Sequence, residues 1–367
     1  MKNHLILSTC GTSILTNTPD SEVRTLVIRN ANAKRGALAP DDLARLEAHI
    51  AARRTELLAC TNPADAKWLS AELNGILSYY DNQLRGRERD RHVLIVSDTF
   101  LGEAVGEIIR AWLGAQGLSV QVQKFAGLVT DDYSSFRNAM IQLIRWCEET
   151  LPGYRSADYR VVFNLTGGFK SAQGFMQTVG MFYADESVYI FETGSLLRIP
   201  RLPIRLDIDG LMAQYGDKLR LLSHGQTLST QEVTGIPETL LFEVDGEVTL
   251  SEWGELVWQQ SKRALYGRDL LAPLPGLRFG DGFRKSVERQ RLTSDQLAVL
   301  NERLDQLSFV SQGKGSNLRG LDFKALKGDP KPPSTHECDI WSGDERRLFG
   351  HYADDVFVID NIARGLH

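Results

Sequence analysis

A glycine-rich loop at 166–172 carries the residues with the clearest chemistry, in the order Thr-Gly-Gly-Phe-Lys-Ser-Ala. It follows an apolar, β-branched stretch at 160–165, and apolar residues at helical spacing come after it. This order predicts a buried strand, a tight loop, and a helix that has Lys170 in its first turn. Such a junction presents free backbone N–H groups and the positive end of a helix dipole, which favour anions and above all phosphates.

A second loop of similar chemistry lies at 8–13 and reads Ser-Thr-Cys-Gly-Thr-Ser. Neither loop has the spacing of a dinucleotide fingerprint or of a P-loop, because a phenylalanine separates glycine from lysine at 168–170. A plainer alternative is that Gly167 and Gly168 only make a tight turn. Against it, a cation in the first turn of a helix is unfavourable unless an anion compensates for it. The two loops therefore predict an anion-binding crevice.

Basic and imidazole side chains gather near the C-terminal end of the chain. They are Lys324, Lys327, Lys331, His336, Arg346, Arg347, His351, Arg364 and His367. Few carboxylates stand at metal-ligand spacing among them. Metal-free RNA cleavage needs a base for the 2′-OH, cations on the scissile phosphate and a proton donor for the leaving 5′ oxygen. The cluster has residue types for all of these roles.

Apolar strands that alternate with amphipathic helices are expected to position the two loops. The strand candidates are 4–8, 93–97, 120–125, 161–165 and 188–192. Nearly continuous apolar strands with helices between them predict an α/β doubly wound, Rossmann-like domain, whose parallel sheet is covered on both faces. Ligands of such sheets bind beyond the carboxyl ends of the strands, where both loops are expected to lie.

Shifts in pattern divide the chain into expected domains. The first spans 1–205, and a small connector of helix, alternating stretch and helix spans 206–272. A Pro-Leu-Pro-Gly boundary then opens the last domain, 273–367. The connector is either a winged-helix-like module or packing material. In the last domain a leucine-rich helix precedes three alternating stretches, which predicts a compact α+β fold with an antiparallel meander.

The composition is that of a soluble globular protein, with 367 residues, 42% hydrophobic residues and a net charge of −5. Overall charge gives no argument for nucleic-acid binding, so any basic surface must be local. The four cysteines are far apart and form no CxxC pair, which disfavours a disulfide framework or a zinc site and fits a reducing cytoplasm. No apolar run is typical of a signal peptide or a membrane span.

The two glycine loops, each directly after an apolar strand, resemble the CARF domain, a Rossmann-like sensor of CRISPR-associated proteins. The resemblance covers the first expected domain. It implies a homodimer that binds a cyclic oligoadenylate made by a type III CRISPR complex during antiviral defence, with the tetra-adenylate favoured. Carried over by position, the ligand-binding residues would be Thr9, Cys10, Gly11, Thr12, Ser13, Thr166, Gly167, Gly168 and Lys170.

A third segment joins this set through the same resemblance. Ser97, Asp98 and Thr99 follow the second expected strand and would contact the ligand from there. An alternative is that they cap the following helix, which has Glu103 in its first turn.

The last domain resembles the RelE/ParE toxin fold. The resemblance rests on the order of a Leu-Lys-Gly loop at 326–328, an arginine pair that begins a strand at 346–347, and Asp-Asp-Val before the last strand at 354–356. It implies an mRNA interferase, which is an endoribonuclease that cuts mRNA in the ribosomal A site. Such an enzyme uses the RNA 2′-OH as nucleophile and needs no metal or other cofactor.

By this resemblance Arg347 matches the strand arginine of the phosphate site, and Arg364 matches the basic residue near the chain end. The sequence lacks the family's paired lysines and late tyrosine. His336 and His367 are the nearest substitutes, and His351 completes the expected catalytic set. Alternation along a strand puts only one of Arg346 and Arg347 in the site, and we favour Arg347. The residues expected to bind the RNA backbone are Lys324, Lys327, Lys331 and Arg346.

Two other functions are open. The stretch 346–351 fits R-x4-H, the motif of HEPN ribonucleases that act on free RNA, although HEPN domains are helical and this stretch alternates. A ligand-responsive DNA-binding regulator would instead use the connector as a winged helix, with 251–265 as its recognition helix. That segment balances two cations with two carboxylates, which argues against DNA binding.

Overall fold

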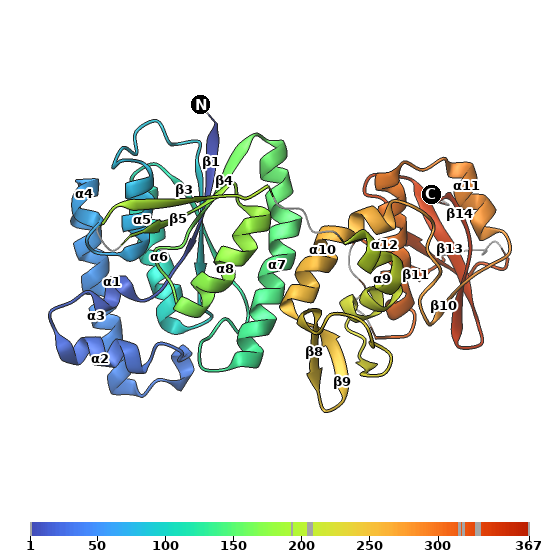
Figure 1. Cartoon of the computed structure of the whole chain (residues 1–367), viewed down its shortest axis with the longest axis horizontal. Coiled ribbons are helices and arrows are strands. Elements are labelled where there is room, and N and C mark those ends of the chain that lie inside the picture. The colour runs from blue at the N-terminus through green and yellow to red at the C-terminus, as the bar shows by residue number, and fades with distance from the viewer. Residues whose placement is uncertain are drawn as a thin grey trace. The chain divides into compact units, whose positions relative to one another are not determined.

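The computed structural model of the chain describes residues 2–191, 194–203, 208–314, 317, 320–326 and 332–365. It divides into two compact units, Met1–Arg205 and Leu206–His367 (Figure 1). Three of the predicted site residues, Lys327, Lys331 and His367, lie outside the described residues.

Unit 1 is built on a six-stranded sheet with the order β3-β2-β1-β4-β5-β6. The first five strands in this order are parallel, and β6 is antiparallel to β5. The strands are β1 (Asn3–Thr9), β2 (Arg91–Val96), β3 (Ser119–Lys124), β4 (Tyr159–Asn164), β5 (Glu186–Ile190) and β6 (Leu196–Pro200). The predicted mixed α/β fold with a mainly parallel sheet is therefore confirmed.

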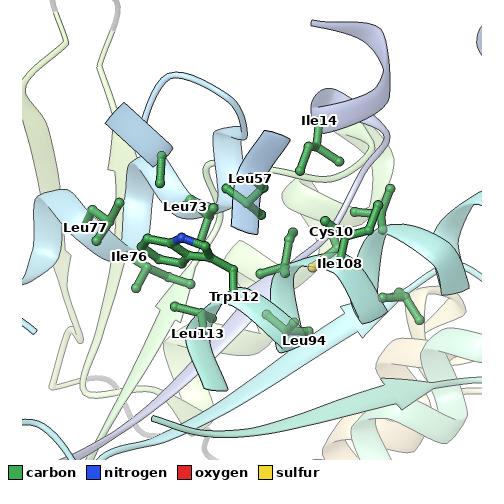
Figure 2. Close-up of a cluster of buried hydrophobic side chains, with 14 of the residues drawn as sticks. Cys10, Ile14, Leu57, Leu73, Ile76, Leu77, Leu94, Ile108, Trp112 and Leu113 are labelled. Atoms are coloured by element: carbon green, nitrogen blue, oxygen red, sulfur yellow. The ribbon is translucent and has the colours of Figure 1, made fainter. Parts of the chain in front are cut away.

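Helices cover both faces of this sheet, as Figure 1 shows with α3, α5 and α6 on one side and α7 and α8 on the other. The helices of unit 1 are α1 (Ser13–Thr16), α2 (Ser21–Arg29), α3 (Pro40–Ala59), α4 (Pro63–Ala66), α5 (Ala71–Tyr79), α6 (Phe100–Ala115), α7 (Tyr133–Ser156) and α8 (Lys170–Tyr183). Ile6, Leu94 and Val162 belong to the core on the α6 side. Figure 2 shows Leu94 in this core together with Trp112 of α6. Because helices cover both faces of the sheet, most side chains on both sides of the central strands β1, β2 and β4 are buried. These strands are therefore nearly continuous apolar runs.

The strand order reverses at β1. The chain proceeds from β1 to β2 and β3 on one side, and then returns to place β4 on the other side of β1. In open α/β sheets the crevice beyond the strands at such a reversal is the usual ligand site. Both glycine loops lie there, since one follows β1 and the other follows β4.

Unit 2 contains a five-stranded sheet with the order β10-β14-β13-β12-β11, in which β10 is parallel to β14 and the other pairs are antiparallel. The strands are β10 (Leu277–Phe279), β11 (Lys324–Ala325), β12 (His336–Asp339), β13 (Arg346–Ala353) and β14 (Val356–Arg364). Two helices, α11 (Phe283–Gln290) and α12 (Ser294–Val310), share an apolar core with this sheet. We call the side that they cover the helix face, and the other side the groove face.

A bulge in β14 sets which residues reach each face. Phe349 of β13 pairs with Asn361, but the next residue, Gly350, pairs with Ile359, so Asp360 is an extra residue in its strand. Because of this extra residue, Ile359 and Ile362 both lie in the helix-face core although they are three positions apart. Asp360 and Asn361 both line the groove face instead.

The expected connector contains α9 (Asp209–Ser223), a short three-stranded sheet and α10 (Glu252–Tyr266). The strands of that sheet are β7 (Leu228–Ser229), β8 (Leu241–Val244) and β9 (Glu247–Leu250). Arg220 of α9 and Asp305 of α12 form a fully buried ion pair, with Nε 2.6 Å from Oδ2. The hydroxyl of Tyr266 donates to the same carboxylate at 2.5 Å. These bonds cross the domain boundary predicted at 272/273, which stays a prediction.

The structure weakens the two alternative functions. The segment expected to read DNA is α10, where Leu256 and Trp258 are buried. Its cations are paired as well, Lys262 with Glu302 at 3.5 Å and Arg263 with Asp295 at 2.8 Å. The R-x4-H stretch is not helical, because residues 346–351 belong to β13.

Candidate functional site

The two glycine loops of unit 1 contact each other at the crevice. The hydroxyl of Thr9 donates a hydrogen bond to the carbonyl of Gly167 at 2.5 Å. Gly168 has a φ of +100°, and a Cβ there would lie 2.9 Å from the Cβ of Thr9. A Cβ at Gly11 would lie 3.1 Å from the backbone of Gly168. Glycine is therefore needed for the loops to approach this closely.

A buried carboxylate that sequence reasoning missed joins these loops to α5. Glu72 has no exposed surface, and one oxygen accepts the backbone N–H of Gly11 at 2.7 Å. Its other oxygen accepts the hydroxyls of Ser13 at 2.8 Å and Ser70 at 2.5 Å. A Cβ at Gly167 would lie 2.2 Å from Glu72. Some of the hydrogen-bond donors that were expected to bind an anionic ligand, the Gly11 N–H and the Ser13 hydroxyl, therefore bind the carboxylate of Glu72 instead.

Asn164 connects the end of β4 to both loops. Its side-chain amide, which is fully buried, donates to the Ser8 hydroxyl at 3.2 Å and to the Glu72 carbonyl at 3.0 Å. Its oxygen accepts the hydroxyl of Thr166 at 2.8 Å. The loops are thus held in place by bonds among their own polar groups.

The residues predicted to bind the ligand separate into inward-facing and accessible ones. Cys10 is buried in the core with Ile14 and Leu94 (Figure 2), and burial raises the pKa of its thiol. Gly11 and Gly167 are buried too, whereas Thr12 and Gly168 are partly accessible and Lys170 is exposed. Helix α8 begins without a side-chain cap, so the N–H groups of its first turn are free for an anion beside Lys170.

The third predicted ligand segment caps α6. The hydroxyl oxygen of Thr99 accepts a hydrogen bond from the N–H of Gly102 at 3.0 Å. This is the contact expected if the segment caps the helix, the alternative stated for it above. Burial raises the pKa of Asp98, but the N–H of Gly127 and the ammonium of Lys34 outweigh burial and hold that pKa at about 2. An ionised Asp98 does not favour an anionic ligand at this point.

In unit 2 the sheet places the predicted catalytic and RNA-binding residues on different faces. Arg346 lies on the helix face, 4.3 Å above the ring of Trp341 and 2.6 Å from Asp344. His336 also lies there, stacked at 5.3 Å on Phe323, and burial lowers its pKa. Since side chains alternate along a strand, Arg347 and His351 are on the groove face.

Two cations predicted to be catalytic, Arg347 and Arg364, and one predicted to bind RNA, Lys324, have acidic partners. Arg347 lies 2.7 Å from Asp339, its cross-strand neighbour. Arg364 pairs with Glu345, and Lys324 pairs with Asp322, in both cases at exposed positions. Exposed ion pairs contribute little stability and open easily, so these cations can still exchange their partners for phosphates.

His351 belongs to a polar chain that sequence reasoning also missed. Its Nδ1 lies 3.0 Å from the carboxylate of Asp360, and the hydroxyl of Ser334 donates to that carboxylate at 2.7 Å. The groove beside this pair has a volume of about 620 Å³ and is lined by Arg278 and Asn361 among others. Asp360 was a detectable candidate, since a carboxylate inside an apolar strand is unusual.

Two features are absent from the described part of the chain. No group of three His, Cys, Asp or Glu side chains there is arranged to hold a metal ion. No helix in the same residues has the length and apolar character to cross a membrane.

A family of CRISPR-associated proteins matches part of the chain. Its model, described as CRISPR-associated protein (Cas_APE2256), matches residues 67–202. The matched segment contains Glu72 and the loop at 166–172, but not the loop at 8–13 and none of unit 2. A search of curated proteins gives no match.

One solved structure is similar over much of the chain. It is described as Enterococcus italicus Csm6 bound to cyclic hexa-2′-fluoro-hexa-dAMP. The match has a TM-score of 0.28 and 8% identity, and it covers 86% of this chain and 56% of that protein. The chain thus spans little more than half the length of that protein, and a likeness this distant carries no argument here.

Proposed function

We propose that this protein is an endoribonuclease of type III CRISPR defence that a cyclic oligoadenylate activates. Unit 1 would be the sensor and unit 2 the effector. One observation carries the proposal: the two glycine loops meet at the strand reversal of a parallel sheet, next to the uncapped start of α8 and Lys170. The match of residues 67–202 to CRISPR-associated proteins supports the assignment to this defence system.

The accessible groups of the crevice suit the phosphates of a cyclic oligoadenylate. Lys170 and the first N–H groups of α8 supply positive charge, while Glu72 already satisfies the inner donors. A phosphate would therefore bind at the α8 side of the crevice. We propose that two copies of the chain pair so that both crevices contact one ring, with cyclic tetra-adenylate as the preferred ligand.

Unit 2 would cleave mRNA by attack of the RNA 2′-OH on the adjacent phosphate, leaving a 2′,3′-cyclic phosphate. His351 and Arg347, on the groove face, combine a proton acceptor with a cation. The relation to RelE toxins, the dependence on ribosomes and the independence of metals belong to this proposal. They rest on the sequence resemblance of the last domain.

The test is cleavage of a translated mRNA in a reconstituted translation system, with and without cyclic tetra-adenylate or hexa-adenylate. We expect cutting that needs both ligand and ribosomes. Lys170→Ala should raise the ligand concentration needed for half-maximal cutting about tenfold, the loss of one charge-assisted contact. The matched control is Arg54→Ala, which removes an exposed cation of α3.

Three outcomes would count against parts of this proposal. Cutting of naked RNA at the same rate would remove the ribosome from it. Cleavage at the same rate with and without the ligand would contradict the sensor role proposed for unit 1. A protein that cuts no RNA under any of these conditions would overturn the proposal as a whole.

A further inference from the structure

The register of the unit 2 sheet lines up an arginine and a histidine across three strands. Arg278 of β10 pairs with Val358 of β14, and Val358 pairs with His351 of β13. Paired residues point to the same face, so all three belong to the groove face. Since strands lie about 4.8 Å apart, the Cα atoms of Arg278 and His351 are about 10 Å apart. The short side chain of Val358 between them leaves room for the groove.

The polar groups that contact His351 determine which nitrogen of its imidazole carries the proton. Asp360 is only 10% exposed at its side chain and lies 3.0 Å from Nδ1. Ser334, which is buried, holds the same carboxylate through a 2.7 Å hydrogen bond. A carboxylate on Nδ1 keeps the proton on that nitrogen, so the lone pair of Nε2 is available to accept another. The β14 bulge is what makes Asp360 available for this contact.

The groove also offers positive charge for an anion. Among the described residues no ion-pair partner is found for Arg278, unlike Arg346, Arg347 and Arg364. Asp281 lines the same groove and disfavours a second phosphate at that end. A volume of about 620 Å³ is sufficient for a nucleotide and its flanking phosphate.

We propose that this groove binds an RNA phosphodiester and that His351 is the base that starts its cleavage. Asp360 is a positioning residue for the imidazole, and Arg278 contacts the phosphate. This inference rests on the proposed ribonuclease function and assigns the centre that performs it.

The reaction balances without any added reagent. Nε2 of His351 takes the proton of the 2′-OH, and O2′ forms a bond to phosphorus while the bond from phosphorus to O5′ breaks. The leaving O5′ takes a proton from water, and the imidazolium returns its proton to solvent. The products are a 2′,3′-cyclic phosphate and a 5′-hydroxyl. Arg278 stabilises the added negative charge on the phosphate oxygens.

Arg347, the arginine favoured from the sequence, is less well placed for the scissile phosphate. It lies four residues from His351 along β13, a distance of about 13 Å between Cα atoms, and its guanidinium faces Asp339. Its position suits the next phosphate along the RNA.

The experiment uses the full chain with ribosomes, a translated mRNA and cyclic tetra-adenylate, and measures the single-turnover cleavage rate. His351→Asn should reduce the rate about 10²- to 10⁴-fold, the usual contribution of a general base. Asp360→Asn should reduce it at least about tenfold, because the amide no longer favours the useful tautomer. Arg278→Ala should reduce the rate without changing its pH dependence. The matched controls are Asp355→Asn and Arg289→Ala, which alter exposed residues of the same unit.

A conservative variant separates positioning from mere structural support. Asp360→Glu keeps a carboxylate on the groove face and should recover part of the rate that Asp360→Asn loses. The other charged groups that line the groove, Arg278 and Asp281, are unchanged in both variants. Thermal unfolding of each variant checks that it folds, and His351→Gln is a second variant if His351→Asn does not.

The outcomes distinguish this inference from the function on which it rests. A wild-type protein that cuts no RNA overturns both. If the wild type cuts while His351→Asn and His351→Gln cut as fast as the controls, the ribonuclease function stands and this centre is wrong. An Asp360→Asn variant that cuts as fast as the wild type would show that Asp360 is not part of the centre.

Discussion

Glu72 accepts a 2.7 Å hydrogen bond from the backbone N–H of Gly11, across 61 positions of the sequence. The same carboxylate lies where any side chain at Gly167 would have to go. One residue of α5 thus touches the loop after β1 and the loop after β4. A ligand that displaces either loop would therefore also displace Glu72 or break its hydrogen bonds. Glu72 thus connects the crevice directly to α5.

We expect Glu72→Gln to destabilise unit 1 by about 1–3 kcal/mol, because hydrogen bonds to a charged acceptor contribute more than neutral ones. The shape of the side chain is kept, so the effect reports the lost charge. Urea unfolding at neutral pH measures it. The matched control is Glu107→Gln, at a half-exposed position of α6, with an expected change below about 0.5 kcal/mol. Equal effects of the two changes would contradict the role given to Glu72.

Gly168→Ala should destabilise the protein by about 1–3 kcal/mol, since the φ of +100° is strained for any other residue and the new Cβ meets Thr9. It should also weaken binding of cyclic tetra-adenylate, because it pushes the two loops apart. Calorimetric titration and thermal unfolding measure the two effects. Gly36→Ala is the matched control, with no atom within 4 Å of the added Cβ. Unchanged stability in Gly168→Ala would show that the loop relaxes freely.

Acid should destabilise unit 1 through His92. Burial lowers the pKa of this imidazole to about 3, below its ordinary value of 6.5. Between these values the unfolded chain binds a proton that the folded chain does not, so stability is complete above pH 6.5 and is lost as pH falls. One pH unit below 6.5, the loss should approach about 1.4 kcal/mol. Urea unfolding at pH 7 and 5.5 measures this, and His92→Gln should show a correspondingly smaller difference between the two.

Arg220→Met should destabilise unit 2 by about 3–5 kcal/mol, because it leaves Asp305 buried without its cation. The double variant with Asp305→Leu should recover most of this loss, since no unpaired charge is left. Limited proteolysis and urea unfolding of the full chain are the measurements. If residues 206–272 formed a separate connector, Arg220→Met would leave the unfolding of the C-terminal sheet unchanged.

Local pattern was enough to predict the strands of the parallel sheet and the position of both glycine loops. The loop before Lys170 was found because a strand, glycines and a helix occur in sequence there. Glu72 was not found, because its partner Gly11 is far away in the chain and only the fold brings them together. Contacts of this kind depend on strand order, which a single sequence does not give.

The same limit applies to the catalytic candidates. Alternation along one strand correctly places Arg346 and Arg347 on opposite faces of the sheet, because neighbouring side chains point in opposite directions. Alternation within a strand cannot predict whether His336 and His351 share a face, because they belong to different strands. The register between the strands places them on opposite faces. The face on which Asp360 lies was hidden for another reason: a bulge breaks the alternation on which such predictions depend.

That bulge makes this stretch sensitive to the length of the chain as well as to its composition. Losing one residue between Ile359 and Ile362 would restore plain alternation and keep Ile362 in the core, because Ile359 and Ile362 would then be two positions apart. Deleting Asp360 would also take away the carboxylate beside the imidazole of His351, whereas deleting Asn361 would leave Asp360 on the groove face. Point substitutions at Asp360 change the carboxylate and keep the bulge, whereas single-codon deletions at 360–361 remove the bulge and keep both isoleucines in the core.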